Sequence, residues 1–314
     1  MTSKTIVITG PTATGKTHLG VMLAKKLNGE VVSADSMQIY KHMDIGSAKP
    51  DAEEMDGVRH HMIDVVEPDE AYSVSRYVEE ADKAMQDIIS RGKIPIIVGG
   101  TGLYIESLLS GRDFAPQPET AQVREELSAE YDSIGGTEML KKLSVFDPVS
   151  AERLHSNDKK RIVRAFEVYM TSGETITEHD ERTRNIPPRY ESCRIALTFN
   201  DRGDLYDRID RRVDVMMERG LVSEVEKLLG MGIDERCTSM QGIGYKEIAL
   251  AIKEECTLEE AVERVKMESR RYAKRQLSWL RRDKELLWIN WEKEPDFNEG
   301  LQVSTKFAVI SGIS

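Results

Sequence analysis

The sequence is poor in cysteine and has no long apolar run. Its three cysteines, Cys193, Cys237 and Cys256, form no Cys-x-x-Cys pair, which argues against a zinc knuckle or a disulfide framework. No apolar run reaches the length of about 18 residues that a membrane-spanning helix needs. The apolar stretch after Lys4 turns at once into glycine, so we expect a first strand rather than a signal peptide. These absences favour a cytoplasmic protein with reduced thiols and no membrane partner.

Basic residues are also in the minority. The 44 Lys and Arg residues against 55 Asp and Glu residues give a net charge of -11. Proteins that coat nucleic-acid duplexes without sequence preference are usually basic, so this charge argues against that class. With 314 residues, of which 39% are hydrophobic and 32% charged, the chain has a globular composition and enough length for about two domains.

Short β-branched runs alternate with helical patterns near the N-terminus, beginning with KTIVIT at residues 4–9. This alternation predicts the α/β class, with a parallel sheet flanked by helices. The predicted strands are 4–9, 30–33, 94–98, 193–199 and 286–290, and the predicted helices of this core are 16–27, 74–91, 102–109, 203–219, 221–231, 245–253 and 257–283.

Two proline-rich stretches interrupt this pattern, DFAPQPET at residues 113–120 and TRNIPPRY at residues 183–190. The segment between them is charged and helical, with no convincing strand. We therefore predict a core formed by residues 1–115 and 190–314, and a helical insertion domain over residues 116–189.

A phosphate-binding loop follows the first strand. Residues 10–17 read GPTATGKT, which matches G-x-x-x-x-G-K-[ST] between a strand and a helix. The backbone N–H groups and the helix dipole would bind phosphate oxygens, Lys16 would reach the terminal phosphate, and the Thr17 hydroxyl could ligate Mg²⁺. The predicted phosphate-binding residues are Gly10, Pro11, Thr12, Ala13, Thr14, Gly15, Lys16 and Thr17.

The usual second acid of phosphoryl-transfer enzymes is missing from the strand IPIIV, which ends in Gly99-Gly100-Thr101. Asp35 is the only acid at a strand end in the early sheet, where ligands bind in open parallel sheets. It could be a metal ligand, a general base or a turn residue. His60 and His61 are adjacent, so their side chains diverge and a structural role is favoured over metal binding.

Positive charge is concentrated in two helical segments. Lys159, Lys160, Arg161 and Arg164 lie at the start of one, and residues 264–284 carry nine basic residues opposed only by Glu268 and Asp283. In an acidic chain this clustering favours a polyanionic partner, although solvated helix faces give the same pattern. Tyr272 and Trp279 within the second segment could form its buried stripe.

Together these segments resemble the tRNA dimethylallyltransferase family, also called tRNA isopentenyltransferases, in its bacterial form. The matching segments span residues 10–282 and read GPTATGKT, SADSMQIYKHMDIGSAKP, HHMIDV, GGTGLY, NDKKRIVRAFEV, MQGIGYKE and YAKRQLSWLR. Ser47 stands where the family usually has threonine. The resemblance implies transfer of a dimethylallyl group from dimethylallyl diphosphate to N6 of the adenosine 3′ of the anticodon, in tRNAs that read codons beginning with U. No Cys/His pattern follows Leu301, whereas eukaryotic relatives often carry a zinc finger there.

The resemblance also implies residue roles and partners. Asp35 would be the base that accepts the N6 proton, Thr101 would contact the target nucleotide, and Arg208 would add a cation on the diphosphate. The substrates would be dimethylallyl diphosphate and a tRNA anticodon stem-loop, whose stem the insertion would clasp, with Mg²⁺ and no obligate protein partner. The tRNA-binding residues would be Asp35, Ser36, Met37, Gln38, Thr101, Val123, Arg124, Lys160, Arg161, Ile162, Val163, Arg164, Gln241, Gly242, Ile243, Gly244, Tyr245 and Lys246.

Three alternatives belong to other functional classes. A P-loop small-molecule kinase would consume ATP and need an arginine directed at the γ-phosphate. An adenylate isopentenyltransferase would act on free nucleotide and have no use for the insertion or the basic helix. A non-catalytic tRNA-binding protein would have no use for an intact GKT loop beside Asp35.

Overall fold

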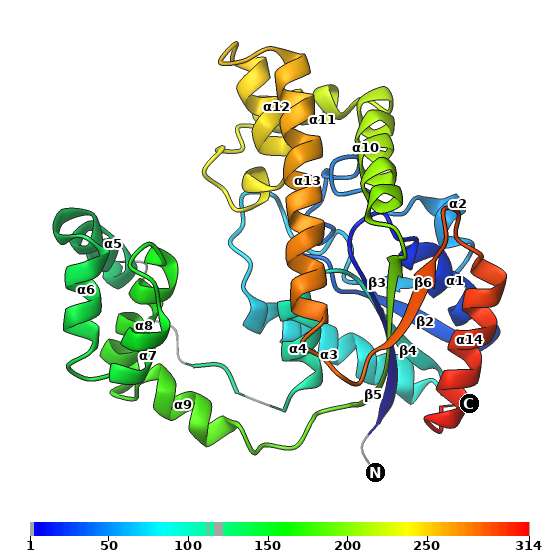
Figure 1. The fold of residues 1–314 in the computed structure, drawn as a ribbon, viewed down its shortest axis with the longest axis horizontal. Helices are drawn as coiled ribbons and strands as arrows, with labels where there is room; N and C mark the ends of the chain where they lie inside the picture. Colours follow the sequence, from blue (N-terminus) through cyan, green and yellow to red (C-terminus); the bar gives the residue numbers. More distant parts are fainter. Residues whose placement is uncertain (1–2, 112, 116–121, 314) are drawn as a thin grey trace. The chain divides into compact units, whose positions relative to one another are not determined.

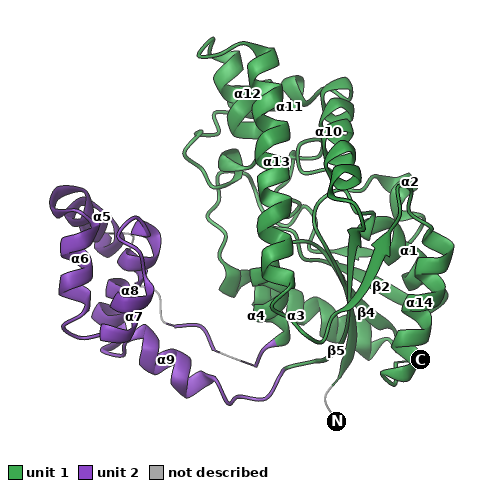
Figure 2. Cartoon of the chain, viewed as in Figure 1, with its two compact units in different colours: residues 1–109, 189–314 green, residues 110–188 purple. Residues whose placement is uncertain are grey.

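A computed structural model describes residues 3–111, 113–115 and 122–313 and divides the chain into two compact units. Unit 1 comprises Met1–Leu109 and Arg189–Ser314, and unit 2 is Ser110–Pro188 (Figure 2). The insertion expected at residues 116–189 begins at residues that lie outside the described part.

Unit 1 is built on a six-stranded sheet with the order β3-β2-β4-β1-β5-β6. The strands are β1 (Lys4–Thr9), β2 (Gly29–Ser33), β3 (His60–His61), β4 (Ile94–Val98), β5 (Glu191–Phe199) and β6 (Leu287–Trp291). Every pairing is parallel, which confirms the predicted α/β class. Because the strands are parallel, their carboxyl ends meet at one edge, where the loops after β1, β2 and β4 come together.

Helices cover both faces of this sheet. Figure 1 shows α1 (Lys16–Lys26) and α14 (Phe297–Ile310) on one side, and α3 (Val74–Ser90) and α4 (Gly102–Leu109) on the other. Ile6, Ile8 and Leu19 are completely buried in the core beneath α1. Each such side chain contributes about 1.5–3 kcal/mol relative to an exposed one, so the sheet is a rigid support for the loops at its edge.

A second core in unit 1 joins the loop after β2 to the C-terminal helices. These helices are α10 (Arg202–Glu218), α11 (Leu221–Gly230), α12 (Tyr245–Ile252) and α13 (Leu258–Leu280), with a short 3-10 helix η1 (Ser239–Gln241) before α12 and a one-turn α2 (Ala52–Met55) in the loop. Ile39, Tyr40 and Met43 from the loop pack with Leu221 and Tyr245, all at most 1% exposed. The long segment after β2 is therefore fixed by an apolar core although it contains little regular structure.

The regular elements of unit 2 in its described residues are all helices, as the sequence predicts. Its helices are α5 (Gln122–Ile134), α6 (Gly136–Leu143), α7 (Pro148–Arg153), α8 (Lys159–Ser172) and α9 (Ile176–Thr183). Leu127, Met139, Ile162 and Val163 form its core. No helix of the described chain is long and apolar enough to cross a membrane.

Candidate active site

The phosphate loop connects the end of β1 to the start of α1. Gly10, Ala13 and Gly15 take positive φ values of 147°, 65° and 82°, which curl the backbone around the helix N-terminus. A Cβ on Gly15 would lie 2.6 Å from the Phe297 ring, so only glycine fits there. The positive end of the α1 dipole faces the same point, which makes the loop suited to bind an anion.

Lys16 is the first residue of α1, and its side chain folds back over the loop. Its Nζ donates a hydrogen bond to the Pro11 carbonyl at 2.7 Å. Burial and the charge of Arg212 lower the Lys16 pKa to about 7, while the charge of Asp35 opposes the shift. A bound diphosphate would raise this pKa again, so the site is organised to gain an anion.

Asp35 and Thr101 lie at the ends of the adjacent strands β2 and β4. The Thr101 backbone N–H donates to the Ala34 carbonyl at 3.0 Å, and its Oγ1 accepts from the Ser36 N–H at 3.0 Å. Asp35 Oδ1 accepts from the Met37 N–H at 2.9 Å. Within the described residues Oδ2 of Asp35 accepts no hydrogen bond, so that oxygen is available to a substrate.

The charge of Asp35 reaches several neighbouring groups. It raises the pKa values of Lys16 and Arg212, against the larger lowering that burial causes. It also adds to the raised pKa of Tyr272, which burial brings to about 12. Tyr104 and Tyr77, whose rings stack with centroids 3.9 Å apart, have pKa values raised by burial and by the same carboxylate. The Asp35 carboxylate is therefore close enough to the loop lysine and to these buried phenols for its charge to shift their pKa values.

Arg208 lies against the phosphate loop, as a diphosphate ligand requires. Its Nε donates to the Ala13 carbonyl at 3.3 Å, and its Nη1 pairs with Glu294 at 3.3 Å. Arg212 lies one turn further along α10 and pairs with no other residue of the described chain. Burial lowers its pKa, and the charges of Asp35 and Glu54 oppose that shift. Sequence reasoning missed Arg212, although its spacing of four residues from Arg208 places both on one helix face.

Gln276 is a second functional residue that sequence reasoning missed. Its Oε1 accepts from the Thr12 N–H at 3.0 Å, and its Nε2 donates to the Gly100 carbonyl at 2.9 Å. It therefore touches both the phosphate loop and the loop that carries Thr101. Gln276 belongs to the segment YAKRQLSWLR that carries the family resemblance, and it lies between Ala273 and Leu280 on the buried face of α13, but no role was predicted for it.

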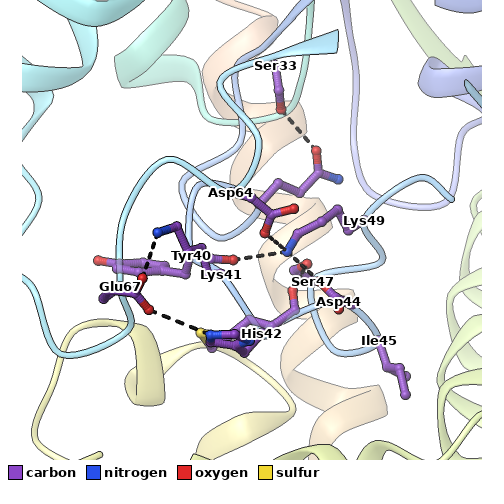
Figure 3. Close-up of polar contacts among 12 residues, drawn as sticks. Ser33, Tyr40, Lys41, His42, Asp44, Ile45, Ser47, Lys49, Asp64 and Glu67 are labelled. Atoms are coloured by element: carbon purple, nitrogen blue, oxygen red, sulfur yellow. Dashed lines mark hydrogen bonds and ion pairs between the residues drawn. The ribbon is translucent and has the colours of Figure 1, made fainter. Parts of the chain in front are cut away.

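The loop after β2, which carries Asp35, Ser36, Met37 and Gln38, is held by polar contacts (Figure 3). Lys49 points into the loop, where its Nζ contacts Asp44, Asp64 and the Tyr40 carbonyl, and its side chain is only 5% exposed. Gln38 is fixed between the Ser33 hydroxyl at 2.9 Å and the Ala48 carbonyl at 3.2 Å.

Glu224 of α11, which lies outside this loop in the sequence, accepts hydrogen bonds from the loop backbone. Its carboxylate accepts from the backbone N–H groups of Asp44, Ile45 and Gly46 at 2.8, 2.8 and 3.0 Å and from the Tyr245 hydroxyl at 2.7 Å. Tyr245 belongs to the segment 241–246 that is predicted to bind tRNA. Glu224 therefore connects this segment to the loop that carries residues 35–38, the other predicted tRNA segment of unit 1. Gln241 and Lys246 are exposed, whereas Gly244 and Tyr245 are buried.

In unit 2 the predicted tRNA residues divide into two groups. Lys160 and Arg161 are exposed, and Arg124 and Arg164 both pair with the buried Glu167. Ile162 and Val163, by contrast, are at most 4% exposed. The side chains of Ile162 and Val163 pack in the core of unit 2 and are not available to RNA. Of the residues predicted to bind tRNA in unit 2, the basic residues and the partly buried Val123 therefore remain.

The basic residues of the stretch 264–284 fall into two groups, those that form ion pairs and those that are exposed without one. Lys266 and Arg270 pair with Asp214 and Asp210 of α10, and Arg271 pairs with Glu268. Glu268 and Asp283 are the acids within the stretch, and the structure adds Asp210 and Asp214 of α10 and Glu263 of α13 as further partners. The basic residues there that remain exposed without an ion pair are Arg264, Lys274, Arg275, Arg281, Arg282 and Lys284. Trp279 is half-buried and packs over the Cα of Gly102.

Three further residues were considered as metal ligands in the sequence: Thr17, His60 and His61. The Thr17 hydroxyl makes no hydrogen bond within the described chain, so it is available to a ligand. No group of three or more His, Cys, Asp and Glu side chains in that part of the chain could hold a metal ion. His61 contacts the buried Glu30 at 2.8 Å, and His60 contacts the Val58 carbonyl, so both have structural partners.

Comparison with known proteins gives close matches over nearly the whole chain. A family model described as IPP transferase matches residues 38–283. The chain is 48% identical over 302 residues to a tRNA dimethylallyltransferase of Acetivibrio thermocellus, covering 96% of each protein. It is 47% identical over 309 residues to one of Bacillus anthracis, covering 98% of this chain and 96% of the relative.

Solved structures agree with this result. The chain is similar to the full-length tRNA isopentenylpyrophosphate transferase from Bacillus halodurans, with a TM-score of 0.73 and 40% identity over 99% of this chain and 97% of that one. It is also similar to a eukaryotic dimethylallyltransferase described as acting on tRNA, with a TM-score of 0.83 and 30% identity over 99% of this chain and 80% of the other.

Proposed function

The chain belongs to the IPP transferase family, and from this premise we propose that it transfers a dimethylallyl group from dimethylallyl diphosphate to tRNA. The acceptor is N6 of the adenosine 3′-adjacent to the anticodon, in tRNAs that read codons beginning with U, and diphosphate is released. A tRNA substrate also supports a cytoplasmic location.

One observation carries this proposal: an anion-binding loop after β1 and a carboxylate after β2 lie at the same edge of the parallel sheet. Lys16 lies on the phosphate loop, and the charge of Asp35 acts on its pKa. Phosphoryl-transfer enzymes also place a base beside the phosphates, but they hold the metal with a further acid, and here the strand β4 is followed by Gly99, Gly100 and Thr101 instead. Prenyl transfer to an exocyclic amine needs both, because a leaving group must be stabilised while a proton is removed.

The phosphate loop would stabilise the departing diphosphate. Breaking the allylic C–O bond leaves positive charge on carbon and negative charge on diphosphate. The loop N–H groups, Lys16 and Arg208 supply positive charge and hydrogen bonds where the negative charge develops. Arg212 has no ion-pair partner among the described residues and would add a further cation.

Asp35 and Thr101 would act on the acceptor. The N6 lone pair of adenine is delocalised into the ring, so the amine is a weak nucleophile. As N6 attacks the allylic carbon, the free Oδ2 of Asp35 accepts its proton. Thr101 lies beside Ser36 at the end of the neighbouring strand and would position the nucleotide.

Mg²⁺ fits this arrangement through Thr17. Mg²⁺ in diphosphate sites is held by one or two protein oxygens together with phosphate oxygens, and the Thr17 hydroxyl has no other partner in the described chain. When bound, the ion would neutralise charge on the diphosphate.

The adenosine must leave the stacked anticodon loop to reach Asp35. Residues 35–38 and the exposed Gln241 and Lys246 would contact loop nucleotides. The exposed basic residues of the stretch 264–284 that have no ion pair, and Arg124, Lys160, Arg161 and Arg164 of unit 2, would contact stem phosphates. In this role unit 2 clasps the anticodon stem.

The test is transfer of label to RNA. The protein is incubated with labelled dimethylallyl diphosphate, Mg²⁺ and unmodified tRNA, and nucleosides from the acid-precipitable RNA are identified by mass spectrometry. The expected product is adenosine with a dimethylallyl group on N6 at the position after the anticodon. A product made only with free adenosine nucleotides, or only with ATP and a small acceptor, would contradict the proposal.

A further inference from the structure

One side chain joins the donor half of the crevice to the acceptor half. Gln276 accepts a hydrogen bond from the Thr12 N–H of the phosphate loop at 3.0 Å. It donates one to the Gly100 carbonyl, next to Thr101, at 2.9 Å. These contacts join residues 264 and 176 positions apart in the sequence, so the amide links two loops that follow different strands.

The surroundings of Gln276 leave it little freedom. Gln276 is only 8% exposed. A Cβ on Gly100 would lie 2.3 Å from the Nε2 atom of Gln276. One turn further along α13, Trp279 packs against Gly102, where a Cβ would lie 2.5 Å from the indole. The same face of α13 therefore contacts both sides of Thr101.

The amide group matches its two partners. The Thr12 N–H needs an acceptor and the Gly100 carbonyl needs a donor, and a primary amide offers one of each. A carboxylate would keep the acceptor and lose the donor, and it would add negative charge beside the phosphate loop. A thioether of similar length would lose both hydrogen bonds.

We propose that Gln276 is a positioning residue that fixes the distance between the diphosphate site and the acceptor site. This proposal rests on the prenyl transfer proposed above. The allylic carbon is held through the diphosphate on the phosphate loop, and the attacking N6 is held by Asp35 and Thr101. A misplacement of about 1 Å between reacting groups can cost 10²-fold in rate, so a link between the two loops affects turnover more than either binding step.

The experiment compares Gln276→Glu, Gln276→Met and the wild-type enzyme. Turnover (kcat) is measured with saturating dimethylallyl diphosphate and tRNA, and KM is measured for each. Dissociation constants are measured separately for the unreactive thiolo analogue of the donor and for tRNA. We expect kcat of Gln276→Met to fall by about 10- to 100-fold, while both dissociation constants change less than about threefold. Tm should fall because two buried hydrogen bonds are lost, so kcat is measured at a temperature where both proteins are folded.

The pH dependence of Gln276→Glu gives a readout that a structural role would not move. A protonated glutamic acid presents one acceptor and one O–H donor, like the amide it replaces. The unperturbed pKa of a glutamate carboxyl is about 4.3 and burial raises it, so the ratio of variant to wild-type kcat should rise as the pH falls from 8 to 5, whereas the ratio for Gln276→Met should stay level. Gln86→Met is the matched control, because Gln86 of α3 also donates one side-chain hydrogen bond, to Tyr190 at 2.8 Å, but touches neither loop.

The outcomes separate this inference from the proposed function. If the wild-type enzyme transfers no label to tRNA, the proposed function fails. If the wild type is active and Gln276→Met keeps its kcat, the inference is overturned. It is also overturned if the variants lose donor affinity in proportion to kcat, since Gln276 would then only support the phosphate loop.

Discussion

At the scale of single residues, the chemistry depends on charges that face each other across one crevice. Lys16 and Arg212 have pKa values lowered chiefly by burial, and Asp35 partly restores both. A diphosphate would add the missing negative charge. The sequence predicts Lys16 from its motif and Asp35 from its position at a strand end. Arg212 and Gln276 are recognised as parts of the site only in the folded structure, where distant segments lie together.

Replacement of Asp35 separates catalysis from binding. We expect Asp35→Ala to lower kcat by about 10²–10⁴-fold, the contribution of a positioned acid or base. Affinity for tRNA should change little, because most contacts to the RNA come from other residues. Transfer of label and filter binding of tRNA measure the two effects. Near-normal turnover in this variant would show that Asp35 is not the base.

The lowered pKa of Lys16 predicts how donor binding depends on pH. Below pH 7 the free enzyme carries a charged Lys16, and donor affinity should be level. Above its pKa of about 7, binding of the anion must first recover a proton, so affinity should fall by up to about tenfold per pH unit. Titration with the thiolo analogue measures this profile.

Lys16→Arg is the matched variant, since arginine stays charged throughout this range. Its affinity for the analogue should be level between pH 7 and 9, even if it is weaker overall. A wild-type profile that is also level over this range would contradict the assigned role of Lys16.

At the scale of elements, the sequence predicts the parts of unit 1 that have a strong local pattern. β1, β4 and β5 are runs of β-branched and apolar residues, so their period and burial are clear. β3 has only two residues, too few to show a pattern. α14 was missed because Gly300 interrupts its interior, and packing of that glycine against Trp291 overrides the weak propensity.

The polar contacts that order the loop after β2 could not be predicted. Glu224 lies about 180 residues from the N–H groups that it binds, and nothing local marks it as their partner. Such long-range contacts depend on the packing of α11 and α12 beside the loop. They explain how residues 35–38 keep one conformation without regular secondary structure.

Loss of the Glu224 carboxylate should loosen this loop. We expect Glu224→Gln to lower the free energy of unfolding by about 1–3 kcal/mol, since hydrogen bonds to charged groups contribute about that much. Affinity for tRNA should fall as well. Urea denaturation and filter binding measure the two effects. Glu226→Gln, at an exposed position on the same helix, is the control and should change neither, and equal behaviour of the two variants would contradict the role of Glu224.

At the scale of the whole molecule, an acidic chain presents local basic surfaces to a polyanion. The net charge is -11, yet Lys274, Arg275, Arg281 and Arg282 of the α13 region remain exposed and unpaired within the described chain. Unit 2 contributes Lys160 and Arg161. Such a distribution favours binding of a particular RNA shape over general coating of nucleic acid.

Salt dependence tests this distribution. We expect the joint Lys274→Ala and Arg275→Ala variant to weaken tRNA binding and to reduce the slope of log K against log salt concentration by up to about 0.7–0.9 per lost phosphate contact. Lys306→Ala, which removes an exposed lysine of α14, should leave the slope unchanged. An unchanged slope in the first variant would remove α13 from the RNA surface.

The most direct test of the central claim is a crystal structure with the thiolo analogue of dimethylallyl diphosphate and an unmodified anticodon stem-loop. The account predicts diphosphate on the loop from Gly10 to Thr17 with Lys16 on its oxygens. It also predicts an adenine turned out of the stack, with N6 about 2.6–3.2 Å from the Asp35 carboxylate. A diphosphate bound elsewhere, or an acceptor base far from Asp35, would contradict the account.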